Sequence, residues 1–163
     1  MTLYFAYGSN LSRAGMQRRC PGAVPVGVAV LDNHRFIVGI DGWGSVVRSP
    51  GAYVHGVVWR ITPRDRAALH AYELLDKGLY DVRMVPVRQK TEFGARRVSA
   101  MTYILRRQTP GIPKPGYVEM IAACARNWNF PEDYVRSIER WSKSRWTGSR
   151  LIEKLDSVTA VGG

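Results

Sequence analysis

Short apolar, β-branched and aromatic runs, each followed by residues that favour turns, make up most of this sequence. Separators such as Gly8-Ser9-Asn10 and Lys77-Gly78 interrupt an extended segment, because glycine and short polar side chains readily leave the strand conformation. Each run can therefore form one short strand, and together the runs predict a largely antiparallel sheet. The expected strands are residues 2–7, 24–31, 35–40, 53–61, 79–87 and 97–105.

Helix signals lie between and after these runs. Ser12 is expected to cap a helix through Arg19, and Thr62, followed by proline and an acid in the first turn, is expected to cap a helix that runs to about Leu75. Two more helices are expected at residues 117–127 and 132–141. The resulting fold class is α+β, a small mixed, barrel-like β-sheet with flanking helices.

Length and composition indicate one domain that needs no disulfide or structural metal for stability. The chain has 163 residues, enough to bury a core without disulfides or a structural metal. Cys20 and Cys124 lie far apart, and the three histidines have no metal-ligand spacing, so neither a metal site nor a disulfide framework is expected. The expected domain covers residues 1–143. Residues 144–163 are expected to form a weakly patterned tail with one helical turn at residues 151–155.

The charge balance is strongly basic, with 24 Lys and Arg against 13 Asp and Glu and a formal net charge of +11. Such an excess is compatible with nucleic-acid binding, but no zinc finger, RNP-type motif or long basic helix accompanies it. Steering of an anionic small substrate, or solubility alone, is the favoured interpretation. No apolar run is long enough to span a bilayer and no signal sequence is visible, so a cytoplasmic protein without a membrane partner is expected.

The segment Tyr7-Gly8-Ser9-Asn10-Leu11 joins an expected strand to an expected helix. Backbone N–H groups in such a connection can converge on an anion. Gly8 is expected to adopt a backbone angle closed to other residues, and Ser9 and Asn10 add short hydrogen-bonding side chains. On spacing alone, a purely structural turn in which Ser9 and Asn10 cap the next helix fits equally well.

Glu73 is the candidate acid. It lies late in the helix that Thr62 begins, beside Tyr72 and four residues after Leu69. Apolar surroundings raise a carboxyl pKa toward neutrality, as a general acid and base requires, although an isolated helix glutamate is more often solvated. Asp76 and Asp81 are alternative acids that are more simply interpreted as turn and surface residues.

Several motifs together resemble the γ-glutamylcyclotransferase family, which has the AIG2-like fold. The opening run from Leu3 to Leu11 resembles the family's opening signature, and further matches follow it in order over residues 3–141. These further matches are Gly56-Val57-Val58-Trp59, residues 69–73 with the catalytic glutamate, Gly78-Leu79-Tyr80 with Val85-Pro86-Val87, and Pro113-Lys114-Pro115-Gly116-Tyr117.

The resemblance implies a barrel-like α+β fold that binds a small γ-glutamyl substrate and releases 5-oxoproline and an amine without a cofactor. Glu73 would be the general base and acid, and the backbone from Tyr7 to Leu11, with Tyr80 and Tyr117, would hold the substrate. The family often has glycine after this glutamate, whereas this chain has Leu74, whose side chain is expected either to narrow the pocket or to alter which leaving group fits. A binding domain without turnover is the alternative, then a nucleic-acid-associated protein. A monomer or homodimer is expected.

Overall fold

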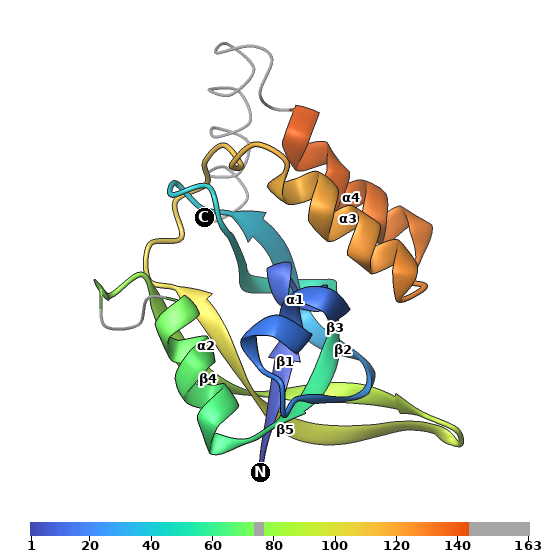
Figure 1. Ribbon diagram of the computed structural model, residues 1–163. Helices are drawn as coiled ribbons and strands as arrows, with labels where there is room; N and C mark the ends of the chain where they lie inside the picture. Colours follow the sequence, from blue (N-terminus) through green and yellow to red (C-terminus); the bar gives the residue numbers. More distant parts are fainter. Residues whose placement is uncertain (74–76, 144–163) are drawn as a thin grey trace.

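Five strands close into a barrel in the order β1-β3-β2-β4-β5 (Figure 1). All neighbouring strands are antiparallel except β1 and β5, which run parallel where Tyr4 faces Met101 and so close the barrel. The computed structural model describes residues 1–73 and 77–143. The expected tail and its helical turn, with Leu74 and Asp76, lie outside the described residues. The strands are β1 (Thr2–Ala6), β2 (Val24–Val38), β3 (Gly44–Ile61), β4 (Tyr80–Thr91) and β5 (Gly94–Leu105).

Several of the expected strand boundaries are wrong, most of all in β2 and β3. The runs 24–31 and 35–40 form the single strand β2, with a register shift between Asp32 and His34. The opposing strand β3 continues through Ser49-Pro50-Gly51, and the Gly51 N–H donates to Asn33 Oδ1 at 3.0 Å. Asn33 and Gly51 both have positive φ, at 56° and 80°. These turn-forming residues therefore build facing bulges in a long hairpin rather than a chain reversal.

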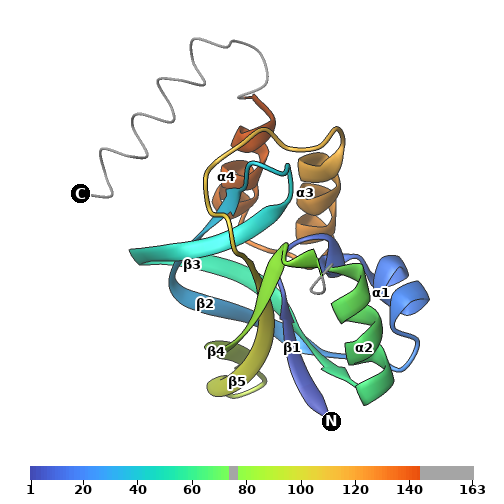
Figure 2. The ribbon, with the colours of Figure 1, turned by 90° about the vertical axis from the view of Figure 1, so that its left-hand side faces the viewer.

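The first two helices start where their caps predict. The helices are α1 (Arg13–Arg19), α2 (Pro63–Tyr72), α3 (Tyr117–Asn127) and α4 (Glu132–Lys143), with a short 3-10 turn, η1 (Ser9–Leu11), before α1. Ser12 Oγ accepts the Gly15 N–H at 3.0 Å, and Thr62 forms a reciprocal capping box with Asp65. Figure 2 shows α1 and α2 side by side against one flank of the barrel. The end of α2 therefore points toward the loop that follows β1.

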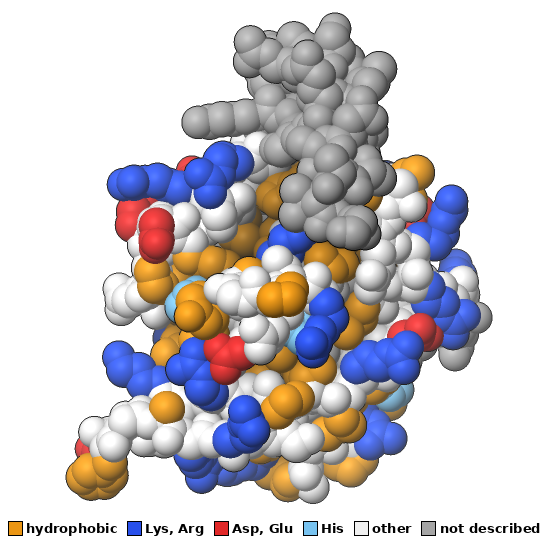
Figure 3. Space-filling model, turned by 180° about the vertical axis from the view of Figure 1, so that it is seen from behind, with side chains coloured by type: hydrophobic (Ala, Val, Ile, Leu, Met, Phe, Trp, Pro, Cys, Tyr) orange, Lys and Arg blue, Asp and Glu red, His pale blue; other side chains and the backbone are white. Residues whose placement is uncertain are grey.

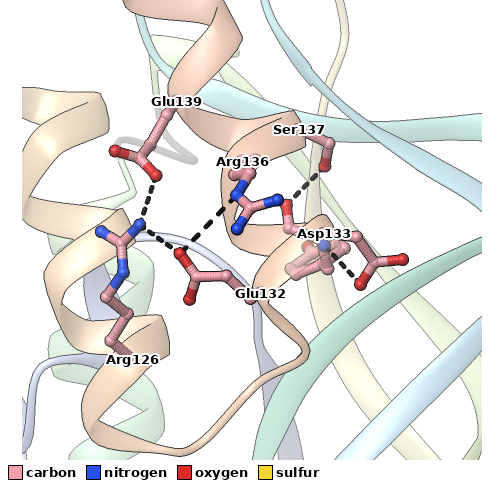
Figure 4. A network of polar contacts seen from close by, with 7 residues as sticks. Arg126, Glu132, Asp133, Arg136, Ser137 and Glu139 are labelled. Carbon is pink, nitrogen blue, oxygen red and sulfur yellow. Dashed lines mark hydrogen bonds and ion pairs between the residues drawn. The ribbon is translucent and has the colours of Figure 1, made fainter.

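The last two helices form a pair at one end of the barrel (Figure 2). Arg126 of α3 donates to Glu132 at 2.8 Å and to Glu139 at 2.5 Å, both on α4 (Figure 4). These side chains are exposed, so the ion pairs add little stability individually. The buried side chains Ile121 and Ile138 join the core on the inner face of the pair, and this apolar packing fixes the start of α3 above the barrel.

Candidate active site

A cavity of about 300 Å³, counting the space at its mouth, lies where the loop after β1 meets the end of α2. Its walls come from seven parts of the chain, so it exists only once the barrel has closed. One carboxyl group and five tyrosine rings dominate the lining. The lining residues are Tyr4, Tyr7, Gly8, Ser9, Asn10, Gly44, Glu73, Tyr80, Tyr103 and Tyr117.

Glu73 lies directly after α2 and faces the loop that follows β1. Its N–H donates to the Leu69 carbonyl at 2.8 Å, which fixes the backbone at the helix end. One side-chain oxygen, Oε1, accepts a hydrogen bond from Asn10 Nδ2 at 3.3 Å. Burial raises the pKa of the Glu73 carboxyl from its ordinary value of 4.5 to about 7, and the nearby Arg19 guanidinium opposes this rise. The group can therefore take up and release a proton near neutral pH.

The loop itself is a 3-10 turn that leaves two donors available. The Leu11 and Ser12 N–H groups donate to Gly8 and Ser9 carbonyls at 3.0 and 3.2 Å. The N–H groups of Ser9 and Asn10 have no acceptor among the residues that the structure describes. Both residues line the cavity, whereas Leu11 is 1% exposed, belongs to the core and does not line it. The loop thus offers two backbone donors beside the carboxyl group.

The loop side chains do not cap the next helix, because Ser12 performs that task. Asn10 is 2% exposed and its Nδ2 donates to Tyr4 Oη at 2.9 Å as well as to Glu73. Gly8 has φ −123° and ψ −128°, outside both the helical and the extended regions, in line with the special backbone angle expected there. Glycine also permits a close approach, since a Cβ on Gly8 would lie 3.2 Å from Tyr117 Oη.

Tyr80 and Tyr117 bind the two backbone polar groups of Gly44. Tyr117 Oη accepts the Gly44 N–H at 2.9 Å, and Tyr80 Oη donates to the Gly44 carbonyl, also at 2.9 Å. A Cβ on Gly44 would lie 2.8 Å from Tyr117 Oη, so the contact requires glycine. Burial raises the pKa of both phenols, which keeps them neutral at physiological pH. The two rings form a fixed, uncharged wall.

Sequence reasoning missed four residues at or beside the cavity: Tyr4, Arg19, Gly44 and Tyr103. Tyr4 lies inside the opening motif from Leu3 to Leu11, so that motif could have indicated it. Arg19 and Gly44 carry no local signal. Tyr103 is brought in by strand pairing: its carbonyl accepts the Tyr7 hydroxyl, and its own hydroxyl lies 2.7 Å from His70 Nδ1.

Other candidate chemistry is absent from the described part of the chain. There, no group of three His, Cys, Asp or Glu residues could hold a metal ion, and no helix is long and apolar enough to cross a membrane. Asp81 pairs with Arg106 at 2.6 Å and does not line the cavity. Lys and Arg side chains spread across the rear face of the molecule in Figure 3 rather than forming one continuous stripe.

Comparisons with known proteins agree with this fold. A model of the AIG2-like family matches residues 53–138. Gamma-glutamylcyclotransferases of Mus musculus and Homo sapiens are each 26% identical over 170 residues, which cover 98% of this chain and 88% of theirs. A solved structure of a gamma-glutamyl cyclotransferase superposes with a TM-score of 0.76 at 27% identity, covering 85% of this chain and 86% of that one.

A crystal structure of an uncharacterized protein from Homo sapiens superposes with a TM-score of 0.78 at 26% identity, covering 95% of this chain and 98% of that one. The family model spans more than half of the present chain. The chain therefore belongs to the AIG2-like family and resembles gamma-glutamylcyclotransferase enzymes over nearly its whole length.

Proposed function

We propose that this protein is an enzyme that cyclises the γ-glutamyl group of a small γ-glutamyl amino acid or amine, releasing 5-oxoproline and the free amine. One observation carries the proposal: the Glu73 carboxyl, with a pKa of about 7, lines the same cavity as Ser9 and Asn10, whose N–H groups have no acceptor within the described part of the chain. The curated relatives support the same reaction class by their name.

Glu73 would move one proton through the reaction. The ionised carboxyl takes a proton from the substrate α-ammonium group, and the freed amine attacks the γ-carbonyl carbon. The new C–N bond closes a five-membered ring, the C–N bond to the leaving amine breaks, and Glu73 returns the proton to the departing nitrogen. The ring nitrogen loses its second proton to water, which leaves the neutral lactam 5-oxoproline. A group with a pKa of about 7 is half ionised at neutral pH, which suits both steps.

The described residues that line the cavity include no Lys, Arg or His, so neutral donors would hold the substrate carboxylate. The Ser9 and Asn10 N–H groups are suitable partners for this carboxylate or for the oxyanion that develops on the γ-carbonyl. Fixed dipoles of this kind stabilise negative charge without reorganising. Tyr80 and Tyr117, held by Gly44, would form the wall that keeps the glutamyl chain folded.

The size of the cavity favours a short substrate. The enclosed space is small and opens at its mouth, so we expect the glutamyl group to enter and the leaving group to be directed toward solvent. We further propose that residues 1–143 form the working domain, in the cytoplasm, as a monomer or homodimer that needs no cofactor. The tail would then be dispensable for turnover.

A panel of γ-glutamyl dipeptides and amines, with 5-oxoproline as the measured product, tests the proposal. Glu73→Gln is expected to lower kcat/KM about 10²- to 10⁴-fold, the usual contribution of one acid–base group. Glu92→Gln, at the exposed β4–β5 turn, is the matched control and is expected to retain activity. Turnover that survives Glu73→Gln would refute the mechanism, and thermal stabilisation by these compounds without product would indicate a binding protein.

A further inference from the structure

We propose that Arg19 is a positioning residue for Glu73: it fixes the orientation of the Asn10 amide so that the amide always presents its NH2 group to the carboxyl. The inference rests on the proposed function, because it concerns the same acid. Arg19 is the last residue of α1 and does not line the cavity. Its hydrogen-bond connection to Glu73 therefore runs through Asn10, in addition to the direct effect of its charge.

The orientation follows from the donors and acceptors present. Arg19 Nε donates to Asn10 Oδ1 at 3.0 Å, and Arg19 Nη2 donates to the same oxygen. A guanidinium group has donors only, so the amide oxygen must face Arg19. The amide nitrogen then faces the other way, where it reaches Tyr4 Oη at 2.9 Å and Glu73 Oε1 at 3.3 Å.

This arrangement favours the ionised carboxyl. An amide NH2 group stabilises a carboxylate, whereas a flipped amide would set its oxygen against the carboxylate and favour the protonated acid. Arg19 excludes the flipped amide because its guanidinium would lose both hydrogen bonds. Its positive charge also acts against the burial of Glu73. Both effects keep part of the base ionised at neutral pH.

Arg19 is itself held in place. Its guanidinium lies over the Tyr72 ring, 4.2 Å from the centroid, and Tyr72 immediately precedes Glu73. Gly15 lies one turn earlier in α1, and a Cβ there would come within 2.8 Å of Arg19 Nη2. Within residues 1–73 and 77–143, no carboxylate pairs with Arg19. Its hydrogen bonds are thus directed to Asn10.

The other titratable groups around Glu73 are phenols and one imidazole. The phenols in the cavity lining belong to Tyr4, Tyr7, Tyr80, Tyr103 and Tyr117. Tyr72 immediately precedes Glu73 in the chain. The imidazole is that of His70, which contacts the Tyr103 hydroxyl. Burial raises the pKa of every phenol in the lining, so these rings stay neutral at the pH where Glu73 titrates. In the described chain, Arg19 is the cation that acts on Glu73.

The test compares Arg19→Met, Arg19→Lys and the control Arg18→Met, which alters an exposed residue of the same helix. Two measurements are made on each full-length protein. The first is the ¹³C NMR titration of the Glu73 carboxyl, assigned with Glu73→Gln. The second is the pH dependence of kcat/KM for 5-oxoproline release, whose acidic limb reports the free enzyme's base.

Arg19→Met is expected to raise the Glu73 midpoint and the acidic limb together by about one pH unit, because it removes the positive charge that acts on the carboxyl and frees the Asn10 amide to turn its oxygen toward the carboxylate. Arg19→Lys is expected to raise the Glu73 midpoint by a smaller amount, since lysine keeps the positive charge but not the paired donors. It also provides the test if Arg19→Met does not fold. Arg18→Met is expected to change neither the Glu73 midpoint nor the acidic limb of kcat/KM.

A folded Arg19→Met or Arg19→Lys protein with an unshifted Glu73 midpoint would overturn the inference, even if its melting temperature fell, because a merely structural role leaves the titration unchanged. The NMR titration needs no substrate. A shifted midpoint in a protein that turns over no γ-glutamyl compound would therefore support the role of Arg19 and refute only the proposed function.

Discussion

Replacing Glu73 with glutamine is expected to stabilise the fold at alkaline pH while it removes activity. Burial raises the carboxyl pKa from 4.5 to about 7, so the folded protein binds this proton more tightly than the unfolded chain does. The free energy of unfolding therefore falls as pH rises from about 4.5 to about 7, and the penalty is complete above that. At about 1.4 kcal/mol per pH unit, the gap corresponds to about 3 kcal/mol.

Urea denaturation of both proteins at about pH 4.5 and about pH 8.5 measures this penalty. The stability advantage of Glu73→Gln is expected to be about 3 kcal/mol larger at the higher pH. Subtracting the two values cancels any effect of glutamine on packing and the titration of all other groups. Glu92→Gln, an exposed control, is expected to show no such pH dependence. An advantage that is equal at both pH values would refute the reasoning.

Three further substitutions test the structural supports of the site. Tyr117→Phe leaves the buried Gly44 N–H without its acceptor, so it is expected to cost about 1–3 kcal/mol in urea denaturation and to lower kcat/KM; unchanged values would contradict the tyrosine wall. Gly8→Ala brings a Cβ to 3.2 Å from Tyr117 Oη and is expected to lower kcat/KM with little change in melting temperature; a lower melting temperature with unchanged kcat/KM would argue against a role in the site. Thr62→Ala removes the cap of α2 and is expected to cost about 1 kcal/mol in denaturation; a neutral effect would mean that Asp65 alone secures this end.

The helix starts could be predicted because their causes are local. Ser12 and Thr62 each accept an N–H three residues later, and both signals lie within four consecutive residues. Residues 117–127, expected as a helix from their apolar spacing, match α3 (Tyr117–Asn127). A cap or a helical stripe needs no partner elsewhere in the chain.

The long hairpin could not be predicted because turns and bulges use the same residue types. Asp32-Asn33 and Ser49-Pro50-Gly51 each favour a chain reversal when taken alone. They form bulges because they lie opposite one another, between the pairs Asp32↔Tyr53 and His34↔Arg48. Only the pairing of β2 with β3 distinguishes the two outcomes.

In the candidate site, too, some residues carry a local sequence signal and others are brought in only by the fold. The loop from Tyr7 to Asn10 and Glu73 stood out through local motif and family resemblance. Their contact joins residues 63 positions apart, and neither residue alone specifies it. Gly44 enters the lining as the first residue of β3, through backbone bonds to two distant tyrosines. Such contributions arise from barrel closure, and the sequence around them carries no chemical motif.

A crystal structure of the Glu73→Gln protein with a bound γ-glutamyl amino acid would test the central claim most directly. The substrate α-nitrogen is expected about 3 Å from the side chain of residue 73, a distance suited to proton transfer. The α-carboxylate or γ-carbonyl oxygen is expected on the Ser9 and Asn10 N–H groups. A substrate bound with its α-nitrogen turned away from residue 73, or bound outside this cavity, would contradict the account.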